Sequence, residues 1–144
     1  MTSALLGLIK RLIGAAVAIC IGLSLVISPF AESVDASEPV MSGNYIEDTV
    51  SVAESLKGTI ALPRDAEGRA EAETEAVQII TAYISRYRNR SQVNQSLSYT
   101  TMQTALNSMA GHYKTFSNRP LPDQLKERLS SQLEKAEQLV TKES

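Results

Sequence analysis

The sequence predicts an all-α protein: an antiparallel, up-down-up-down four-helix bundle that follows an N-terminal export signal. From Ser42 onward, apolar residues recur every three or four positions in four separate segments, the spacing of amphipathic helices. No segment alternates between apolar and polar residues for long enough to propose a strand. The connections between the four segments are mostly short, which favours antiparallel packing of neighbouring helices around one core.

The N-terminal segment has the pattern of an export signal. Lys10 and Arg11 precede an apolar run over residues 12–27, and small and acidic residues follow. Small side chains at Val34 and Ala36 predict cleavage after Ala36. An uncleaved signal anchor is the alternative, because the run is slightly longer than a typical signal core of ~7–15 residues. The predicted organisation is therefore a signal peptide or anchor at residues 1–36, a linker at 37–43 and the bundle at 44–141.

Cys20 is the only cysteine, and it lies inside the apolar run. In an exported chain, a single thiol is removed with the signal, bonded to another molecule or modified by a lipid. Lipidation requires a small residue before the cysteine, yet Ile19 precedes it and the apolar run continues to Val26. The local sequence therefore favours removal of Cys20 with the signal, and lipid attachment to Cys20 remains the alternative.

The first helix is predicted between Asn44 and Pro63. Asn44 and Glu47 have the spacing of a capping box, and Pro63 ends the segment. The expected buried positions are Ile46, Val50, Ala53, Leu56 and Ile60.

The second helix is predicted to start at Asp65, which can cap it, and to have acidic residues where the helix dipole favours them. Its expected buried positions are Val77, Ile80, Ile84 and Tyr87, and its C-terminal end is rich in arginine. Residues 89–98 lack a periodic apolar pattern and form the longest expected connection.

The third helix is predicted to begin at a Ser98 cap, and residues 117–122 cannot continue it. Its expected buried positions are Met102, Ala105, Leu106, Met109, Tyr113 and Phe116. Pro122 opens the fourth helix at the first-turn position that proline tolerates. The buried positions expected there are Leu125, Leu129, Leu133, Ala136 and Val140. Small residues at Ala53, Ala76, Ala105 and Ala136 would let the helix axes approach closely.

The sequence contains no pattern for catalysis, a cofactor or a metal. A di-iron bundle needs Glu-x-x-His on two helices, whereas the only histidine, His112, has Met109 three residues before it. No nucleophile motif or phosphate-binding glycine loop is present. A formal net charge of −2 gives the chain as a whole no electrostatic footprint for nucleic acid.

Two polar clusters are the candidate partner-binding surfaces. Arg86, Arg88 and Arg90 lie at the end of the second helix, although arginines there also offset the helix dipole. The second cluster contains Asn118, Arg119 and Pro120 in the turn before the fourth helix, with His112 and Tyr113 as supporting residues. Arginine and tyrosine are favoured at protein interfaces. The bundle topology places the two clusters at opposite ends.

Five segments of this chain resemble one known family: residues 44–49, 84–88, 99–113, 118–122 and 125–129. The family is that of the small lumenal photosystem II assembly and repair factors, four-helix proteins of the lipoprotein type. The resemblance extends from about Asn44 to Val140, which is nearly the whole chain after the signal.

The resemblance implies a non-enzymatic protein of the thylakoid lumen without a cofactor. It implies binding to photosystem II intermediates before the manganese cluster and the extrinsic subunits are in place. The implied contact is a lumenal loop of an inner chlorophyll-binding antenna subunit. Cyanobacterial members are usually lipid-anchored at the membrane, so the sequence around Cys20 departs from the family pattern. A structural exported bundle with another partner and a cryptic metal or cofactor protein are the rival hypotheses.

Overall fold

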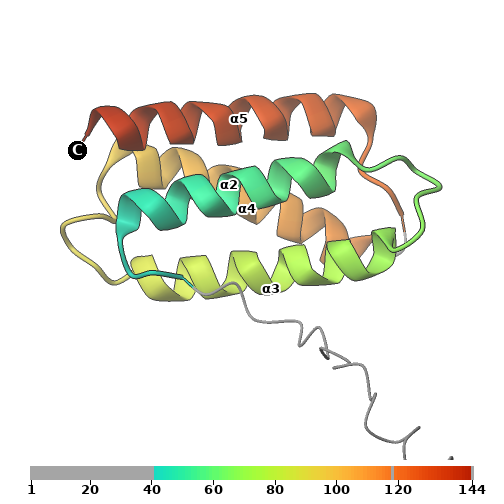
Figure 1. Ribbon diagram of the computed structural model, residues 1–144, viewed down its shortest axis with the longest axis horizontal. Helices are drawn as coiled ribbons and strands as arrows, with labels where there is room; N and C mark the ends of the chain where they lie inside the picture. The colour runs from blue at the N-terminus through green and yellow to red at the C-terminus, as the bar shows by residue number, and fades with distance from the viewer. Residues whose placement is uncertain (1–40, 118, 144) are drawn as a thin grey trace, which may run out of the picture. The chain divides into compact units, whose positions relative to one another are not determined.

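The computed structural model describes residues 41–117 and 119–143, which form an all-α four-helix bundle (Figure 1). The helices are α2 (Tyr45–Ala61), α3 (Arg69–Tyr87), α4 (Leu97–Thr115) and α5 (Asp123–Lys142). No strand occurs within these described ranges. The predicted signal peptide, Cys20 and Asn118 lie outside the described residues.

Each helix packs against its neighbours in the chain, and α2 also packs against α5. Contacts at one end of the bundle establish the directions of the helices. Tyr45, at the start of α2, contacts Tyr87 at the end of α3 and Ser98 at the start of α4. Ser98 also contacts Glu143, which directly follows α5. Consecutive helices therefore run antiparallel, as the up-down-up-down prediction requires (Figure 1).

The predicted cap of the first helix is confirmed, with one difference in detail. The Asn44 side chain accepts hydrogen bonds from the backbone N–H groups of Ile46 and Glu47, at 3.0 and 3.4 Å. The backbone N–H of Asn44 donates to the Ser42 hydroxyl at 3.1 Å, where a capping box would use Glu47.

The predicted start of the second helix at Asp65 is wrong. Residues 63–68 form turns, with the Ala66 N–H donating to the Pro63 carbonyl at 3.1 Å, and α3 begins only at Arg69. The residue before it is Gly68 at a φ of 79°, in the left-handed region that glycine adopts without steric cost. The chain needs these turns to reverse direction, so the helix starts four residues later than Asp65.

The predicted Ser98 cap is also wrong, because Ser96 performs that role. The Ser96 hydroxyl accepts a hydrogen bond from the Tyr99 N–H at 3.1 Å, and Ser98 is buried within the first turn of α4. The connection over residues 88–96 is longer than those over 62–68 and 116–122, as expected. Pro122 lies directly before α5, in the N-cap position, whereas the prediction placed it inside the first turn of the helix.

Most of the predicted core is confirmed. Among the predicted positions, the structure buries Ala53, Leu56, Ile60, Ala76, Ile80, Tyr87, Met102, Ala105, Leu106, Met109, Tyr113, Leu129, Leu133, Ala136 and Val140. Five others are only partly buried: Ile46, Val50, Val77, Ile84 and Leu125. The prediction for Phe116 is wrong, because its side chain is 45% exposed. α4 ends at Thr115, so helical periodicity no longer directs Phe116 towards the core.

The structure also buries residues that the predicted stripes omitted. They are Asp48, Thr49, Val52, Ile79, Tyr83, Ser98, Tyr99, Ala110 and Leu121. The polar members gather at the end of the bundle where α2 begins, and they determine how the candidate arginine surface is held.

Candidate docking surfaces

A buried carboxylate organises the end of the bundle where α2 begins. Asp48 is 3% exposed. Its carboxylate accepts hydrogen bonds from the Ser42 N–H at 2.7 Å, the Ser42 hydroxyl at 2.9 Å and the Gly43 N–H at 3.1 Å. The Tyr87 hydroxyl donates a fourth hydrogen bond from the end of α3. Asp48 thus fixes the chain before α2 and joins α2 to α3.

These four hydrogen bonds also set the ionisation of Asp48. Burial by itself raises the pKa of the carboxyl group, but the hydrogen bonds from Tyr87, Ser42 and Gly43 stabilise the charged form, so the net pKa of Asp48 is lowered. The pKa of the Tyr87 hydroxyl is raised, through burial first and then through its bond to Asp48. Tyr87 therefore remains a neutral donor to a charged acceptor.

A group of tyrosines extends this polar cluster into the core. The Tyr83 hydroxyl bonds to the Thr49 hydroxyl at 2.7 Å, and the Tyr45 hydroxyl bonds to the Ser98 hydroxyl at 2.8 Å. The Tyr83 and Tyr87 rings pack with their centroids 5.0 Å apart. The buried hydroxyl of Tyr99 has no hydrogen-bond partner among the described residues. The cluster links α2, α3 and α4, which positions the residues at the end of α3.

We call Arg86, Arg88 and Arg90 the arginine end. All three side chains are exposed, and none forms an ion pair with a carboxylate of the described residues. Arg90 donates to the Gly43 carbonyl at 3.3 Å, and its guanidinium carbon lies 4.8 Å from the centroid of the Tyr87 ring. The Arg86 guanidinium approaches Gly43 so closely that a Cβ atom there would lie 3.0 Å from Nη2. Gly43, at a φ of 89°, accommodates this approach.

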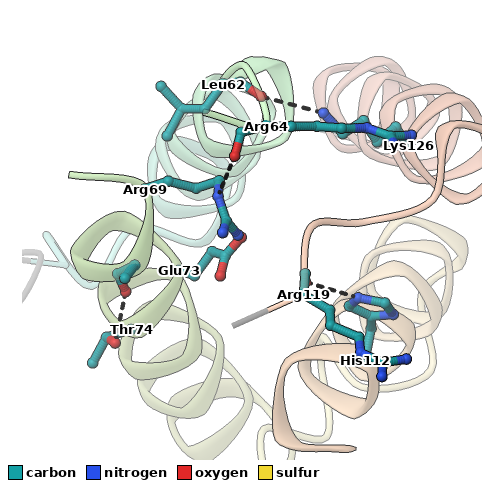
Figure 2. Close-up of polar contacts among 9 residues, drawn as sticks. Leu62, Arg64, Arg69, Glu73, Thr74, His112, Arg119 and Lys126 are labelled. Carbon is teal, nitrogen blue, oxygen red and sulfur yellow. Dashed lines mark hydrogen bonds and ion pairs between the residues drawn. The ribbon is translucent and has the colours of Figure 1, made fainter. Parts of the chain in front are cut away.

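The second predicted surface lies at the opposite end, and we call His112, Phe116, Arg119 and Pro120 the turn patch. The His112 Nε2 atom is 3.2 Å from the Arg119 carbonyl oxygen, a hydrogen bond that Figure 2 shows. The Arg119 N–H donates to the Phe116 carbonyl at 3.0 Å, and the His112 and Phe116 ring centroids are 5.2 Å apart. These contacts hold the turn in one conformation, with the Arg119 side chain exposed.

Tyr113 does not belong to the surface of the turn patch. Its side chain is 8% exposed, and burial, followed by the nearby Glu73 carboxylate, raises the pKa of its hydroxyl. Its ring packs edge-on against His112, with centroids 5.9 Å apart. Tyr113 is therefore a buried neighbour of His112, and its supporting role in docking stays a prediction.

Sequence reasoning missed Asp48, Tyr83 and Phe116. Asp48 lies four residues before Val52 and eight before Leu56, so its spacing already placed it on the buried face of α2. Phe116 had the correct helical spacing, and only the end of α4 at Thr115 exposes it.

The described residues contain neither a group of three or more potential metal ligands nor a helix able to cross a membrane. The fold and the two surfaces define a class: a small all-α bundle with exposed arginines at both ends. The chain belongs to the photosystem II Psb27 family, because it matches the family described as Photosystem II Pbs27 over residues 10–140.

Similar proteins come from cyanobacteria and a plant. The chain is 44% identical over 100 residues to "Photosystem II lipoprotein Psb27" of Synechocystis sp., a match that covers 69% of this chain and 75% of that protein. It is 38% identical over 104 residues to "Photosystem II assembly factor lipoprotein Psb27" of Thermosynechococcus vestitus, covering 72% and 78%. It is 27% identical over 99 residues to "Photosystem II repair protein PSB27-H1, chloroplastic" of Arabidopsis thaliana, covering 68% and 57%.

Two solved structures have the same fold. The solution structure of Psb27 from cyanobacterial photosystem II aligns with a TM-score of 0.68 and 42% identity, covering 72% of this chain and 90% of that one. The crystal structure of PSB27 from Arabidopsis thaliana aligns with a TM-score of 0.66 and 27% identity, covering 69% and 98%. The four-helix fold of this chain is therefore the fold of the family.

Proposed function

We propose that this protein is a non-enzymatic assembly and repair factor of photosystem II. It binds the lumenal face of intermediates before the manganese cluster and the extrinsic subunits are in place. The observation that carries the proposal is the family match over residues 10–140, together with relatives whose names specify photosystem II assembly and repair. The protein acts by docking, at the lumenal side of the thylakoid membrane.

The proposed partner is a lumenal loop of an inner chlorophyll-binding antenna subunit. The turn patch suits such a contact because two hydrogen bonds, from His112 to the Arg119 carbonyl and from the Arg119 N–H to the Phe116 carbonyl, already order it. Little conformational entropy is therefore lost on binding. Arg119 offers a planar set of donors to a carboxylate or a carbonyl group, and Phe116 offers apolar area beside it. Arg86, Arg88 and Arg90 are the second candidate surface, and Asn118 lies next to Arg119 in the sequence.

Affinity isolation from thylakoid membranes tests this proposal. The full chain carries an affinity tag after Ser144, and the host without a tagged protein is the control. We expect inner antenna subunits and other photosystem II components that lack the extrinsic subunits to co-purify. Recovery of fully assembled photosystem II alone, or of no photosystem II subunit, would contradict the proposal. A different recovered partner would instead favour a structural bundle.

The proposed attachment of the protein to the membrane depends on the N-terminal segment. The local sequence favours removal of residues 1–36, whereas two relatives are named lipoproteins, which favours lipid attachment at Cys20. Both outcomes leave the bundle on the lumenal side. A lipid would raise its concentration at the membrane without adding contacts to photosystem II.

A further inference from the structure

The two ends of the bundle differ in how their basic side chains are used. At the turn-patch end, Arg64 forms an ion pair with Asp123 at 3.0 Å, and Arg69 forms one with Glu73 at 2.6 Å. Lys126 at the same end donates to the Leu62 carbonyl at 3.2 Å (Figure 2). The basic groups named here therefore have partners within the bundle.

At the arginine end, the acidic side chains have most of the partners and the basic side chains are exposed. Arg86, Arg88 and Arg90 are exposed without ion pairs to described carboxylates, while the acidic groups nearby are largely occupied. Asp48 is buried beneath four hydrogen bonds, and Glu143 accepts hydrogen bonds from the backbone and the hydroxyl of Ser98. Glu47 is the exposed carboxylate in the first turn of α2. The charge presented at this end is mainly positive.

The arginine end is also where the N-terminal part of the chain joins the bundle. Asp48 holds Ser42 and Gly43, while Arg86 and Arg90 lie against Gly43. The preceding sequence contains the apolar run at residues 12–27, and the family match includes it. A membrane tether at this run, or at Cys20, would therefore be joined to the bundle through the residues that the arginine end contacts.

A large exposed apolar side chain is present at the same end. Leu97, the first residue of α4, is 58% exposed, and it directly follows the Ser96 cap. Arginines beside an exposed aliphatic side chain are typical of surfaces that lie at the interface of anionic bilayers. Phe116, the other large exposed apolar side chain among the described residues, lies at the opposite end.

We propose that the arginine end binds the surface of an anionic lipid bilayer, with Arg86, Arg88 and Arg90 contacting lipid headgroups and Leu97 entering the interface. The turn patch at the other end then points away from the bilayer and remains accessible to a protein partner. The proposal uses the membrane location in the proposed function but does not depend on photosystem II. An acidic protein loop is the competing occupant, and the position of the N-terminal junction favours the bilayer.

Vesicle co-sedimentation with the full chain tests the proposal. Phosphatidylcholine vesicles with and without phosphatidylglycerol are compared, because an apolar tether binds both kinds equally and only the charge contribution distinguishes them. We expect preferential binding to the anionic vesicles. Each arginine near such a surface contributes roughly fivefold, so the triple change R86Q/R88Q/R90Q should reduce the anionic preference by up to about a hundredfold.

The matched control is K114Q/R128Q/K135Q, which removes the same charge from exposed positions away from the arginine end. It should keep the anionic preference. Because Arg90 also contacts Gly43 and Tyr87, the double change R86Q/R88Q is measured in parallel, with melting curves for all variants. R86K/R88K/R90K should keep lipid binding, because charge is sufficient there, whereas paired contacts to protein carboxylates need the arginine geometry.

Three results would overturn the proposal. The first is equal binding of the unaltered chain to anionic and neutral vesicles. The second is an equal loss of anionic preference in the matched control, which would mean that this preference depends on net charge rather than on the arginine end. The third is unchanged lipid binding in R86Q/R88Q/R90Q together with lost capture of photosystem II subunits, which would assign the arginines to protein docking. If the unaltered chain binds the anionic vesicles but captures no photosystem II subunits, only the proposed function is contradicted.

Discussion

The Tyr87 hydroxyl donates a 2.5 Å hydrogen bond to Oδ2 of Asp48, joining the end of α3 to the first turn of α2. The same carboxylate holds Ser42 and Gly43, so one buried charge orders the chain before α2. Arg86 and Arg90 in turn lie against Gly43. A buried network of this kind is costly to break, because each remaining group loses its hydrogen-bond partner.

Replacing Asp48 by asparagine should lower the free energy of unfolding by about 2–3 kcal/mol near neutral pH, because hydrogen bonds to a charged acceptor are lost. The pKa of Asp48 is lowered in the folded state, so its contribution is present above the unfolded value of about 3.9. It is lost as the pH falls through the folded pKa. Urea unfolding of both proteins across this range should show their difference narrowing on acidification. A difference that is constant with pH would contradict the assignment.

Two conservative tyrosine changes separate hydrogen bonding from packing. Tyr87→Phe removes a donor to the Asp48 carboxylate and should cost about 1.5–3 kcal/mol. Tyr99→Phe removes a hydroxyl that lacks a partner among the described residues, and it should be neutral or slightly stabilising. Both changes keep the buried ring. Chemical denaturation measures the two free energies, and a larger loss for Tyr99→Phe would refute the network.

Truncation of Leu106 tests the core. Leu106 is fully buried on α4, so Leu106→Ala should lower the free energy of unfolding by ~2–5 kcal/mol. Phe116→Ala is the control on the same segment, and its side chain is 45% exposed, so thermal and urea unfolding should change little. Similar losses at both positions would mean that Phe116 packs in solution as the helical spacing predicted.

Reversing the charge of Arg119 tests the turn patch. Arg119→Glu should weaken association with photosystem II that lacks manganese, while the circular dichroism spectrum and the melting temperature stay nearly unchanged. Lys135→Glu, with the same change of charge on an exposed part of α5, should bind normally. Binding of the unaltered chain should weaken as salt rises, because exposed charges are screened over ~10 Å at 0.1 M ionic strength. Normal binding by Arg119→Glu at every salt concentration would place the interface elsewhere.

Intact-mass analysis of the native protein determines its N-terminus. The bulky Ile19 and the apolar run beyond Cys20 predict cleavage after Ala36, which leaves a chain that begins at Ser37 without added mass. A chain that begins at Cys20 and carries acyl groups would show that the lipoprotein relatives are the better guide. In that case, replacing Cys20 by serine should abolish the added acyl mass.

The sequence predicted the four helices and most of the core because both depend on local periodicity. Leu106, Met109, Leu129 and Leu133 are buried where their spacing placed them. Helix boundaries were less predictable. Asp65 and Ser98 are both suitable capping residues, but the path of each connection decided that Gly68 and Ser96 precede the helices.

The candidate surfaces show the same division. The sequence identified the arginines and the turn at Arg119 by composition, and the bundle topology put them at opposite ends. The sequence did not identify Asp48 as the residue that holds Gly43 beside Arg86. It also did not identify His112 as the partner of the Arg119 carbonyl.

The sequence by itself determined the fold class and the family resemblance, because helix periodicity and residue identity are written along the chain. Only the tertiary structure decided which polar residues are buried and which arginines have no ion pair with a carboxylate of the described residues. Asp48 and Tyr87 are separated by 39 positions in the sequence, and their hydrogen bond exists only once α2 and α3 pack. Charges and hydrogen bonds depend on distance in space, which the order of residues does not specify.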